Sequence, residues 1–311
     1  MKLLNKTTNF DFMGRRRLAV SISIILVIVS IAALFTRGLE FGIDFTGGVL
    51  IEVGYTNDAD LSLVRTQLDG VGYTDAIVQH FGTARDVLIR LAPQEEMDGN
   101  VIRDRILSAL GSVEPDVELR RVEFVGPQVG KELAENGALA MMIAMILILI
   151  YVAFRFQWKF AVGSVAALLH DVIVTVGFFS ILGLDFDLSV LAAILAVIGY
   201  SLNDTIVVFD RIRENFLKAR RGHSVDIMNL SINQMLARTL ITGITTLLVL
   251  LALFFLGGEV IRPFSIALIV GIVVGTYSSI YVASATALGL DITVEDMLPP
   301  ERDDDELDEL P

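Results

Sequence analysis

The chain has 311 residues and a net charge of −13, and 54% of its residues are hydrophobic, more than the roughly 45–50% of an average soluble domain. It contains no cysteine, which excludes disulfides and thiolate metal sites. Its three histidines are too scattered for a metal site. No basic face with interleaved aromatic residues is present, so no nucleic-acid partner is expected. The apolar excess lies in blocks, which indicates a membrane protein.

Six apolar stretches approach or exceed the ~20 residues that a helix needs to cross a bilayer. The first follows three arginines, as a signal peptide would. It is long for a signal sequence and lacks an Ala-x-Ala cleavage site, so we expect a retained span. The predicted spans are residues 18–36, 137–154, 160–182, 188–209, 239–256 and 264–288.

Lysine and arginine predict the orientation of these spans. The opposite short loops contain only Arg262. By the positive-inside rule, residues 1–17, the loop 210–238 and the acidic tail 289–311 are expected in the cytoplasm. The basic residues on that side are Arg15, Arg16, Arg17, Arg155, Lys159, Arg211, Arg213, Lys218, Arg220, Arg221 and Arg238.

Residues 37–136 form the one large loop on the outer side. Alternating apolar residues and turn signals predict the order strand, helix, strand, strand, helix, strand, which is typical of a ferredoxin-like split βαβ domain. About 100 residues are enough to bury a core. No Ser-His-Asp set, P-loop or carboxylate pair stands out, so this domain is not expected to be an enzyme. The predicted elements are 48–55, 60–71, 76–81, 86–92, 99–110 and 117–125.

The fourth predicted span contains Asn203 and Asp204. Asp204 lies five residues before Phe209, or ~7–8 Å inside the span at ~1.5 Å per residue. A carboxylate in hydrocarbon is costly and is usually functional and paired. It either exchanges protons for transport or forms a fixed interhelical hydrogen bond or ion pair. Asn203 is able to hydrogen-bond the carboxyl group in both protonation states.

Arg238 begins the fifth predicted span, in which Arg238, Thr242 and Thr245 share one helix face. An arginine at this position is by itself an ordinary anchor at the membrane interface. A polar stripe inside a span should face protein or water and not lipid. Arg238 is therefore a candidate counter-ion for Asp204.

Other polar and small residues in the spans allow more than one interpretation. His170 and Asp171 lie near the middle of the third span, where they either extend a proton path or form a structural hydrogen-bonded pair. Gly271 and Gly275 have the small-xxx-small spacing of closely packed helices, and Gly199 is predicted to serve the same purpose in the fourth span.

Several long motifs, in the right order along the chain, resemble the SecF family of the bacterial Sec protein translocase, within the resistance-nodulation-division superfamily. The resemblance extends from about Phe10 to about Leu290 and excludes the acidic tail. The motifs are FGIDFTGGVLIEV (41–53), LLHDV (168–172), GLDFDL (183–188) and IGYSLNDTIVVFDRIRE (198–214).

The resemblance implies a polytopic α-helical protein of the bacterial inner membrane, with six transmembrane helices and one periplasmic α+β domain between the first two. It implies a SecD partner in a pseudo-twofold arrangement, and as further partners the SecYEG channel, often YajC, a translocating polypeptide and membrane lipid. The coupling ion is the proton, and no other cofactor is expected. Asp204 matches the family's transport carboxylate and Arg238 its fifth-span arginine.

The function implied is proton-driven assistance to late steps of polypeptide export. Two alternatives remain open from the residues. One is a small-molecule or lipid exporter of the same superfamily, although a single domain of about 100 residues leaves little room for a substrate cavity. The other is a passive subunit that stabilises a partner, in which Asp204 and Arg238 matter only for assembly.

Overall fold

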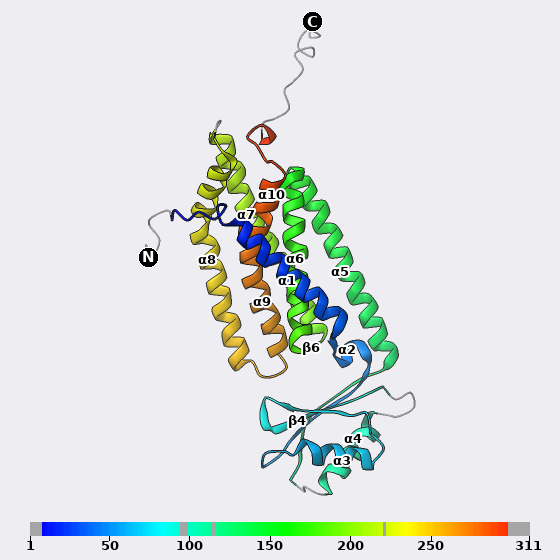
Figure 1. The fold of residues 1–311 in the computed structure, drawn as a ribbon. Helices are drawn as coiled ribbons and strands as arrows, with labels where there is room; N and C mark the ends of the chain where they lie inside the picture. Colours follow the sequence, from blue (N-terminus) through cyan, green and yellow to red (C-terminus); the bar gives the residue numbers. More distant parts are fainter. Residues whose placement is uncertain (1–7, 94–98, 113–115, 220–221, 298–311) are drawn as a thin grey trace.

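The protein is described by a computed structural model that covers residues 8–93, 99–112, 116–219 and 222–297. It consists of a helical bundle with an α+β domain at one end (Figure 1). Within the described residues, six helices are long and apolar enough to cross a membrane, which confirms the predicted six-span fold. They are Arg16–Thr36 (α1), Pro127–Arg155 (α5), Trp158–Leu182 (α6), Leu188–Ala219 (α7), Ser224–Leu256 (α8) and the sixth span, Arg262–Gly289.

The sixth span is not a uniform α-helix. It consists of α9 (Arg262–Ser278), a π-helical turn (η1, Ser279–Ala283) and α10 (Ser284–Gly289). A π-turn inside an α-helix is uncommon and occurs frequently at functional sites. This turn lies within the span and begins at the buried Ser279, directly after Ser278, which is also buried and ends α9.

The segment 210–238, predicted as a loop, is instead mostly helical. Helix α7 continues to Ala219 and α8 already begins at Ser224. The prediction followed the basic residues and overlooked apolar residues that recur between them at helical spacing. These residues pack in the bundle core, because both helices turn the same kind of face inward. The buried residues are Ile212, Phe216, Ile227, Met228 and Ile232.

The α+β domain has the predicted ferredoxin-like topology. Its sheet has the strand order β3-β4-β2-β5, and all neighbouring strands are antiparallel. Its buried core is separate from that of the bundle. The elements are β2 (Gly48–Gly54), α3 (Leu61–Gly70), β3 (Ile77–Phe81), β4 (Thr83–Leu91), α4 (Gly99–Gly111) and β5 (Glu118–Val125).

Short elements that were not predicted connect this domain to the bundle. Strand β1 (Glu40–Phe41) pairs in parallel with β6 (Asp185–Phe186), which lies just before α7. The following turn, α2 (Ile43–Thr46), places Asp44 so that its carboxylate accepts a hydrogen bond of 3.0 Å from the backbone N–H of Leu188. This carboxylate satisfies an N–H group in the first turn of α7. The α+β domain is thereby anchored to the start of that helix.

The glycine pair between α2 and β2 is required by the backbone. Gly47 has a φ of +71° and Gly48 a φ of +129°, values that other residues rarely adopt. A Cβ on Gly47 would lie 2.9 Å from the Cα of Pro127, where α5 begins. A Cβ on Gly48 would overlap the carbonyl oxygen of Leu91. The two glycines therefore let β2, β4 and the start of α5 approach one another.

The cap of α3 predicts an acid-sensitive step in the α+β domain. Asp60 accepts hydrogen bonds from the Ser62 hydroxyl and from the N–H groups of Ser62 and Leu63, which lower the pKa of its carboxyl group. Because the folded-state pKa of Asp60 is lowered, the cap stabilises the domain fully at pH values above the unfolded-state pKa. This stabilisation is lost as the pH falls from the unfolded-state pKa through the folded-state pKa. We expect residues 48–126, expressed alone, to lose stability below about pH 3.9, the ordinary Asp value.

Urea unfolding of that fragment as a function of pH, followed by circular dichroism, measures this effect. Asp60→Asn keeps a capping side chain that does not titrate, so its acid-side slope should be shallower. An equal slope in both fragments would contradict the assignment of the effect to Asp60.

Candidate functional site

The charged residue predicted to be central, Asp204, is buried among the helices of the bundle. It lies on α7, which packs against α6, α8 and α9, and it is only 3% exposed. Its Oδ2 atom is buried and has no hydrogen-bond partner among the described residues. A buried carboxyl oxygen that lacks a donor is costly to keep charged. Asp204 is therefore buried, and its Oδ2 atom is free to bind a proton.

Arg238 lies near Asp204 but does not form an ion pair with it. The two charges interact electrostatically, yet no ion pair of 4.0 Å or less joins them among the salt bridges of the described chain. Arg238 is exposed on α8. Thr242 and Thr245, one and two turns further on, donate to carbonyls of their own helix. The structure thus places Arg238 near Asp204 and leaves its side chain accessible from outside the bundle.

The structure separates Asn203 from Asp204. Asn203 is exposed, whereas Asp204 faces the interior of the bundle. Adjacent residues of an α-helix point about 100° apart, so the two side chains lie on different faces. No hydrogen bond connects them, in contrast to the role predicted for Asn203.

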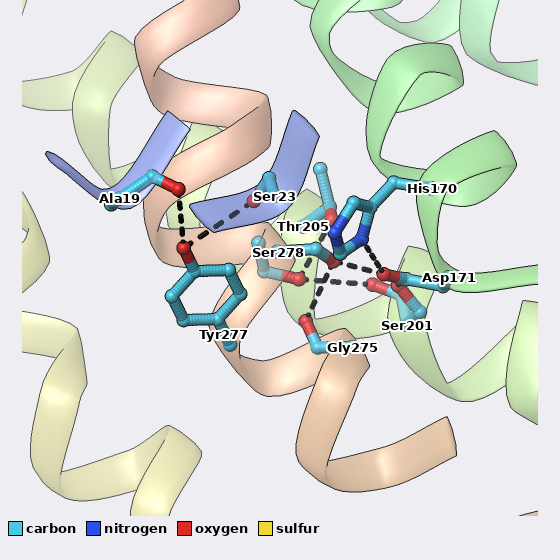
Figure 2. Close-up of polar contacts among 10 residues, drawn as sticks. Ala19, Ser23, His170, Asp171, Ser201, Thr205, Gly275, Tyr277 and Ser278 are labelled. Carbon is cyan, nitrogen blue, oxygen red and sulfur yellow. Dashed lines mark hydrogen bonds and ion pairs between the residues drawn. The ribbon is translucent and has the colours of Figure 1, made fainter. Parts of the chain in front are cut away.

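His170 and Asp171 form the centre of a buried hydrogen-bond network (Figure 2). Asp171 is fully buried, and its Oδ1 lies 2.9 Å from Nδ1 of His170. Its Oδ2 accepts hydrogen bonds from the hydroxyl groups of Ser201 at 2.5 Å and Ser278 at 2.7 Å. These residues come from α6, α7 and α9. The carboxyl group of Asp171 thus connects three spans, and both of its oxygens have hydrogen-bond partners.

The network continues into the π-helical turn. The hydroxyl groups of Thr205 and Ser279 lie 2.9 Å apart, and the Ser279 hydroxyl also reaches the carbonyl of Ser201 at 3.4 Å. Ser201 and Thr205 are one helical turn apart on α7, with Asp204 between them. The helix that carries Asp204 is therefore held by polar contacts directly beside that residue. From the sequence we interpreted Ser201, Ser278 and Ser279 only as small residues that allow close helix packing, and their hydrogen bonds were not predicted.

A second polar contact connects the sixth span to α1. The Tyr277 hydroxyl donates to the carbonyl of Ala19 at 2.7 Å and accepts from Ser23 at 3.3 Å (Figure 2). Tyr277 and His170 have ring centroids 6.3 Å apart. Helix α1 precedes the α+β domain in the chain and crosses α6 in the view of Figure 1. Polar contacts thus connect the sixth span both to α7 and to the helix that leads to that domain.

The predicted packing glycines have different environments. A Cβ on Gly275 would lie 3.0 Å from the Cβ of Ser201, and one on Gly271 would overlap Val197. At Gly199 the structure differs from the prediction. A Cβ at this position would meet nothing within 4 Å, because the residue faces outward. Among the described residues, Gly199 therefore packs against no other helix. Sequence analysis missed Gly163, whose Cβ would lie 2.6 Å from the carbonyl oxygen of Ala283.

The same substitution at two of these glycines should have opposite effects. Gly271→Ala is expected to destabilise the chain by about 1–3 kcal/mol, because Val197 is fully buried and cannot move aside. Gly199→Ala should be neutral or stabilising by up to about 1 kcal/mol through helix propensity. Unfolding of each purified chain in mixed micelles with rising SDS compares them. Equal stability of the two variants would contradict the packing described here.

Comparison with known proteins identifies the family. The family described as "Protein export membrane protein SecD/SecF, C-terminal" matches residues 105–292, more than half of the chain, and "SecD/SecF GG Motif" matches residues 32–59. The chain belongs to the SecD/SecF family. It is 52% identical to the protein translocase subunit SecF of Vibrio alginolyticus, and the match covers 100% of this chain and 99% of that protein. The SecF subunit of Pseudomonas aeruginosa is 49% identical, with 96% and 97% coverage.

Solved structures of SecDF share the fold. The crystal structure of SecDF from Thermus thermophilus, described as a translocon-associated membrane protein, is 40% identical and superposes with a TM-score of 0.84. A SecDF structure in a super-membrane-facing form superposes with a TM-score of 0.69. Each match covers 94% of this chain but 40% of the SecDF chain. The protein thus spans about two-fifths of the SecDF chain and resembles the first of these structures more closely. The predicted SecF resemblance is confirmed.

The site offers protonation chemistry and no recognisable metal centre. Within the described ranges, no group of three or more His, Asp or Glu residues is placed to hold a metal ion. The two buried carboxyl groups of the helical bundle differ in their surroundings. Asp171 has hydrogen-bond partners on both oxygens, whereas Asp204 has an unpartnered oxygen among the described residues. A buried carboxyl group with an unpartnered oxygen, such as Asp204, is suited to gaining and losing a proton.

Proposed function

We propose that the chain is a proton-driven auxiliary subunit of the Sec translocase, which promotes late steps of polypeptide export. One observation carries this proposal: Asp204 is buried within a candidate span and one of its carboxyl oxygens has no hydrogen-bond partner among the described residues. The SecF relatives, which are translocase subunits by name, support the export role.

The contrast between two carboxylates supports Asp204 as the proton-exchanging group. Protonating Asp171 would weaken the hydrogen bonds that it accepts from Ser201 and Ser278 and would alter its bond with His170. Protonating Asp204 breaks no such contact. We therefore assign His170 and Asp171 a positioning role, in which they hold α6, α7 and α9 together beside Asp204.

We propose Arg238 as the positive charge whose attraction to Asp204 depends on whether Asp204 is protonated. Neutralising Asp204 removes its attraction to Arg238, which lets α7 and α8 repack. One charge that crosses 100 mV supplies ~2.3 kcal/mol, enough to bias two states that differ by a few kcal/mol. Helix α7 begins at the hydrogen bond from Leu188 to Asp44, and β6 just before it pairs with β1. A movement of α7 would therefore reach the α+β domain through these contacts.

A stripe on α7 supports a partner in the membrane. Ala192, Ala196, Gly199 and Asn203 recur at helical spacing and are exposed in this chain. A polar amide inside a span should face protein or water, and small residues allow close helix contact. SecD, the other half of SecDF, is the proposed partner. By family resemblance we place the complex beside SecYEG, with YajC and the exported polypeptide, in the bacterial inner membrane. Both termini are cytoplasmic and the α+β domain is periplasmic.

The experiment that tests this function uses membrane vesicles that contain the intact translocase with this chain. Polypeptide export is started and then followed to completion with a proton gradient present or collapsed by an uncoupler. Completion should slow on collapse only when the chain is present. If completion depended equally on the gradient in vesicles with and without this chain, the motor role would be refuted. A stabilising subunit would then be favoured, and loss of the chain should lower the amount of assembled partner.

A further inference from the structure

The segment that precedes α1 is bound to α8, and Figure 1 shows it in dark blue beside that helix. Asn233 of α8 holds the backbone of Phe10. Its Oδ1 accepts a hydrogen bond from the N–H group at 2.9 Å, and its Nδ2 donates one to the carbonyl oxygen at 2.8 Å. One turn earlier, Asn229 accepts from the N–H group of Met13 at 2.9 Å and donates to the carboxylate of Asp11 at 2.8 Å. Two asparagines on one face of α8 therefore hold the segment with four hydrogen bonds.

Packing holds the same segment, residues 10–13, which we call the strap. Met13 is fully buried and belongs to the hydrophobic core of the bundle. The rings of Phe12 and Tyr281 of the sixth span meet edge to face, with centroids 5.9 Å apart. Each asparagine uses both its amide oxygen and its amide nitrogen, so the contact fixes the position of the strap along α8.

Helix α1, which follows the strap, rests on a different part of the bundle. It packs against α6 and the π-helical turn, whereas α8 packs against α7 and α9. At Ser30 the approach to α6 is close, because a Cβ on Gly177 would overlap this serine. Helix α1 is thus attached to α6 near its far end and, through the strap, to α8 at its start.

We propose that the strap passes a movement of α8 to the α+β domain through α1. The inference rests on the proposed function, in which neutralising Asp204 lets α7 and α8 repack. A displacement of α8 relative to α6 pulls on the start of α1 and tilts this helix about its contact with Gly177. Helix α1 ends at Thr36, shortly before β1 begins at Glu40, so the tilt reaches the domain. This route is separate from the contacts at the start of α7.

A chain with a single cysteine tests whether the asparagines hold the strap. The protein has no cysteine, so Met13→Cys introduces one thiol. In lipid nanodiscs a maleimide should react slowly with it, because this position is buried. Adding Asn229→Ala and Asn233→Ala removes four hydrogen bonds and should raise the rate at least tenfold, a ratio that corresponds to about 1.4 kcal/mol. An unchanged rate would overturn the proposal, because the strap would then be held without these asparagines.

A second experiment measures proton flux and export completion in vesicles that contain the intact translocase. The chain with Asn229→Ala and Asn233→Ala should keep its proton flux, because Asp204 and Arg238 are unchanged, but the gradient should no longer accelerate completion. The matched control is Asp226→Ala, an exposed position in the first turn of α8, which should keep both. Acceleration that survives in the double variant would overturn the strap alone. A parent chain without acceleration would contradict the proposed function as well, so the two failures are distinguishable.

Cross-linking shows whether attachment of the strap is sufficient. Asp11→Cys and Asn229→Cys are combined with Asn233→Ala, and dibromobimane then bridges the two thiols. Before this reaction the strap is released and the gradient should not accelerate completion, whereas after bridging the acceleration should return. Monobromobimane, which modifies each thiol separately, should not restore it. Acceleration that stays absent after bridging would refute the mechanical role, because α8 and the strap would then be joined without effect.

Discussion

An Asp204→Asn chain is expected to assemble with its partner and yet to complete export no faster with a proton gradient than without one. Asparagine has nearly the same shape as aspartate but cannot exchange a proton, so the buried position stays filled while its charge no longer changes. Proton flux and polypeptide completion, measured in the same vesicles, should both fall to the level seen with an uncoupler. Co-purification with the partner shows whether assembly is retained.

Asp210→Asn is the matched control for this variant. Asp210 lies on the same helix, but its side chain is 42% exposed and pairs with Arg155 at 2.7 Å. Exposed ion pairs contribute little to stability, so this variant should keep gradient-dependent export. Full activity of Asp204→Asn would refute the proton-exchange role. Loss of partner binding by Asp204→Asn would instead indicate that the carboxylate serves assembly.

The Asp171→Leu substitution is expected to have the largest effect on stability. It removes the acceptor of three hydrogen bonds and leaves His170, Ser201 and Ser278 without it, inside a region that water does not reach. The bonds from Ser201 and Ser278 join α6 to other spans, and bonds of this kind contribute roughly 0.6–1 kcal/mol each. The bond with His170 lies within α6 and contributes about 1 kcal/mol. The purified chain should lose about 2–3 kcal/mol in SDS unfolding, and the contacts of α6 with α7 and α9 should loosen.

Asp171→Asn tests whether the effect comes from hydrogen bonding. Its amide oxygen still accepts from a serine, so it should recover part of the lost stability. If Asp171→Leu were as stable as the parent chain, the three-helix network would not hold the bundle. If Asp171→Asn abolished proton flux while the chain remained folded, Asp171 would belong to the proton path, which the residues alone had left open.

Sequence analysis predicted the fold well where a physical rule acts over many residues. Runs of about 20 apolar residues predict spans because hydrocarbon excludes unpaired backbone groups and charges. Alternating apolar residues in 48–55 predicted a strand, which the structure has as β2 (Gly48–Gly54), and the order of the elements predicted the topology of the α+β domain. The alternation did not predict that this strand is buried along almost its whole length. Helix ends were less accurate. The segment 210–238 was taken as a loop because its charges were weighed more than its buried apolar residues.

The site was only partly predictable. Asp204, His170 and Asp171 stood out because charge is rare in a span. Nothing in the sequence indicated that Asp171 would meet two serines from other helices, because such contacts depend on how far each helix is rotated about its axis. The same rotation placed Gly199 and Asn203 on an outer face.

The sequence by itself determined the number of spans, the topology of the domain between the first two and which residues bring charge into the membrane. These follow from local composition and periodicity. Only the tertiary structure decided which of two buried carboxylates is saturated with hydrogen bonds and which has a free oxygen. That distinction depends on donors 30 and 107 positions away from Asp171, at Ser201 on α7 and Ser278 on α9. Only the packing of the helices brings these groups together.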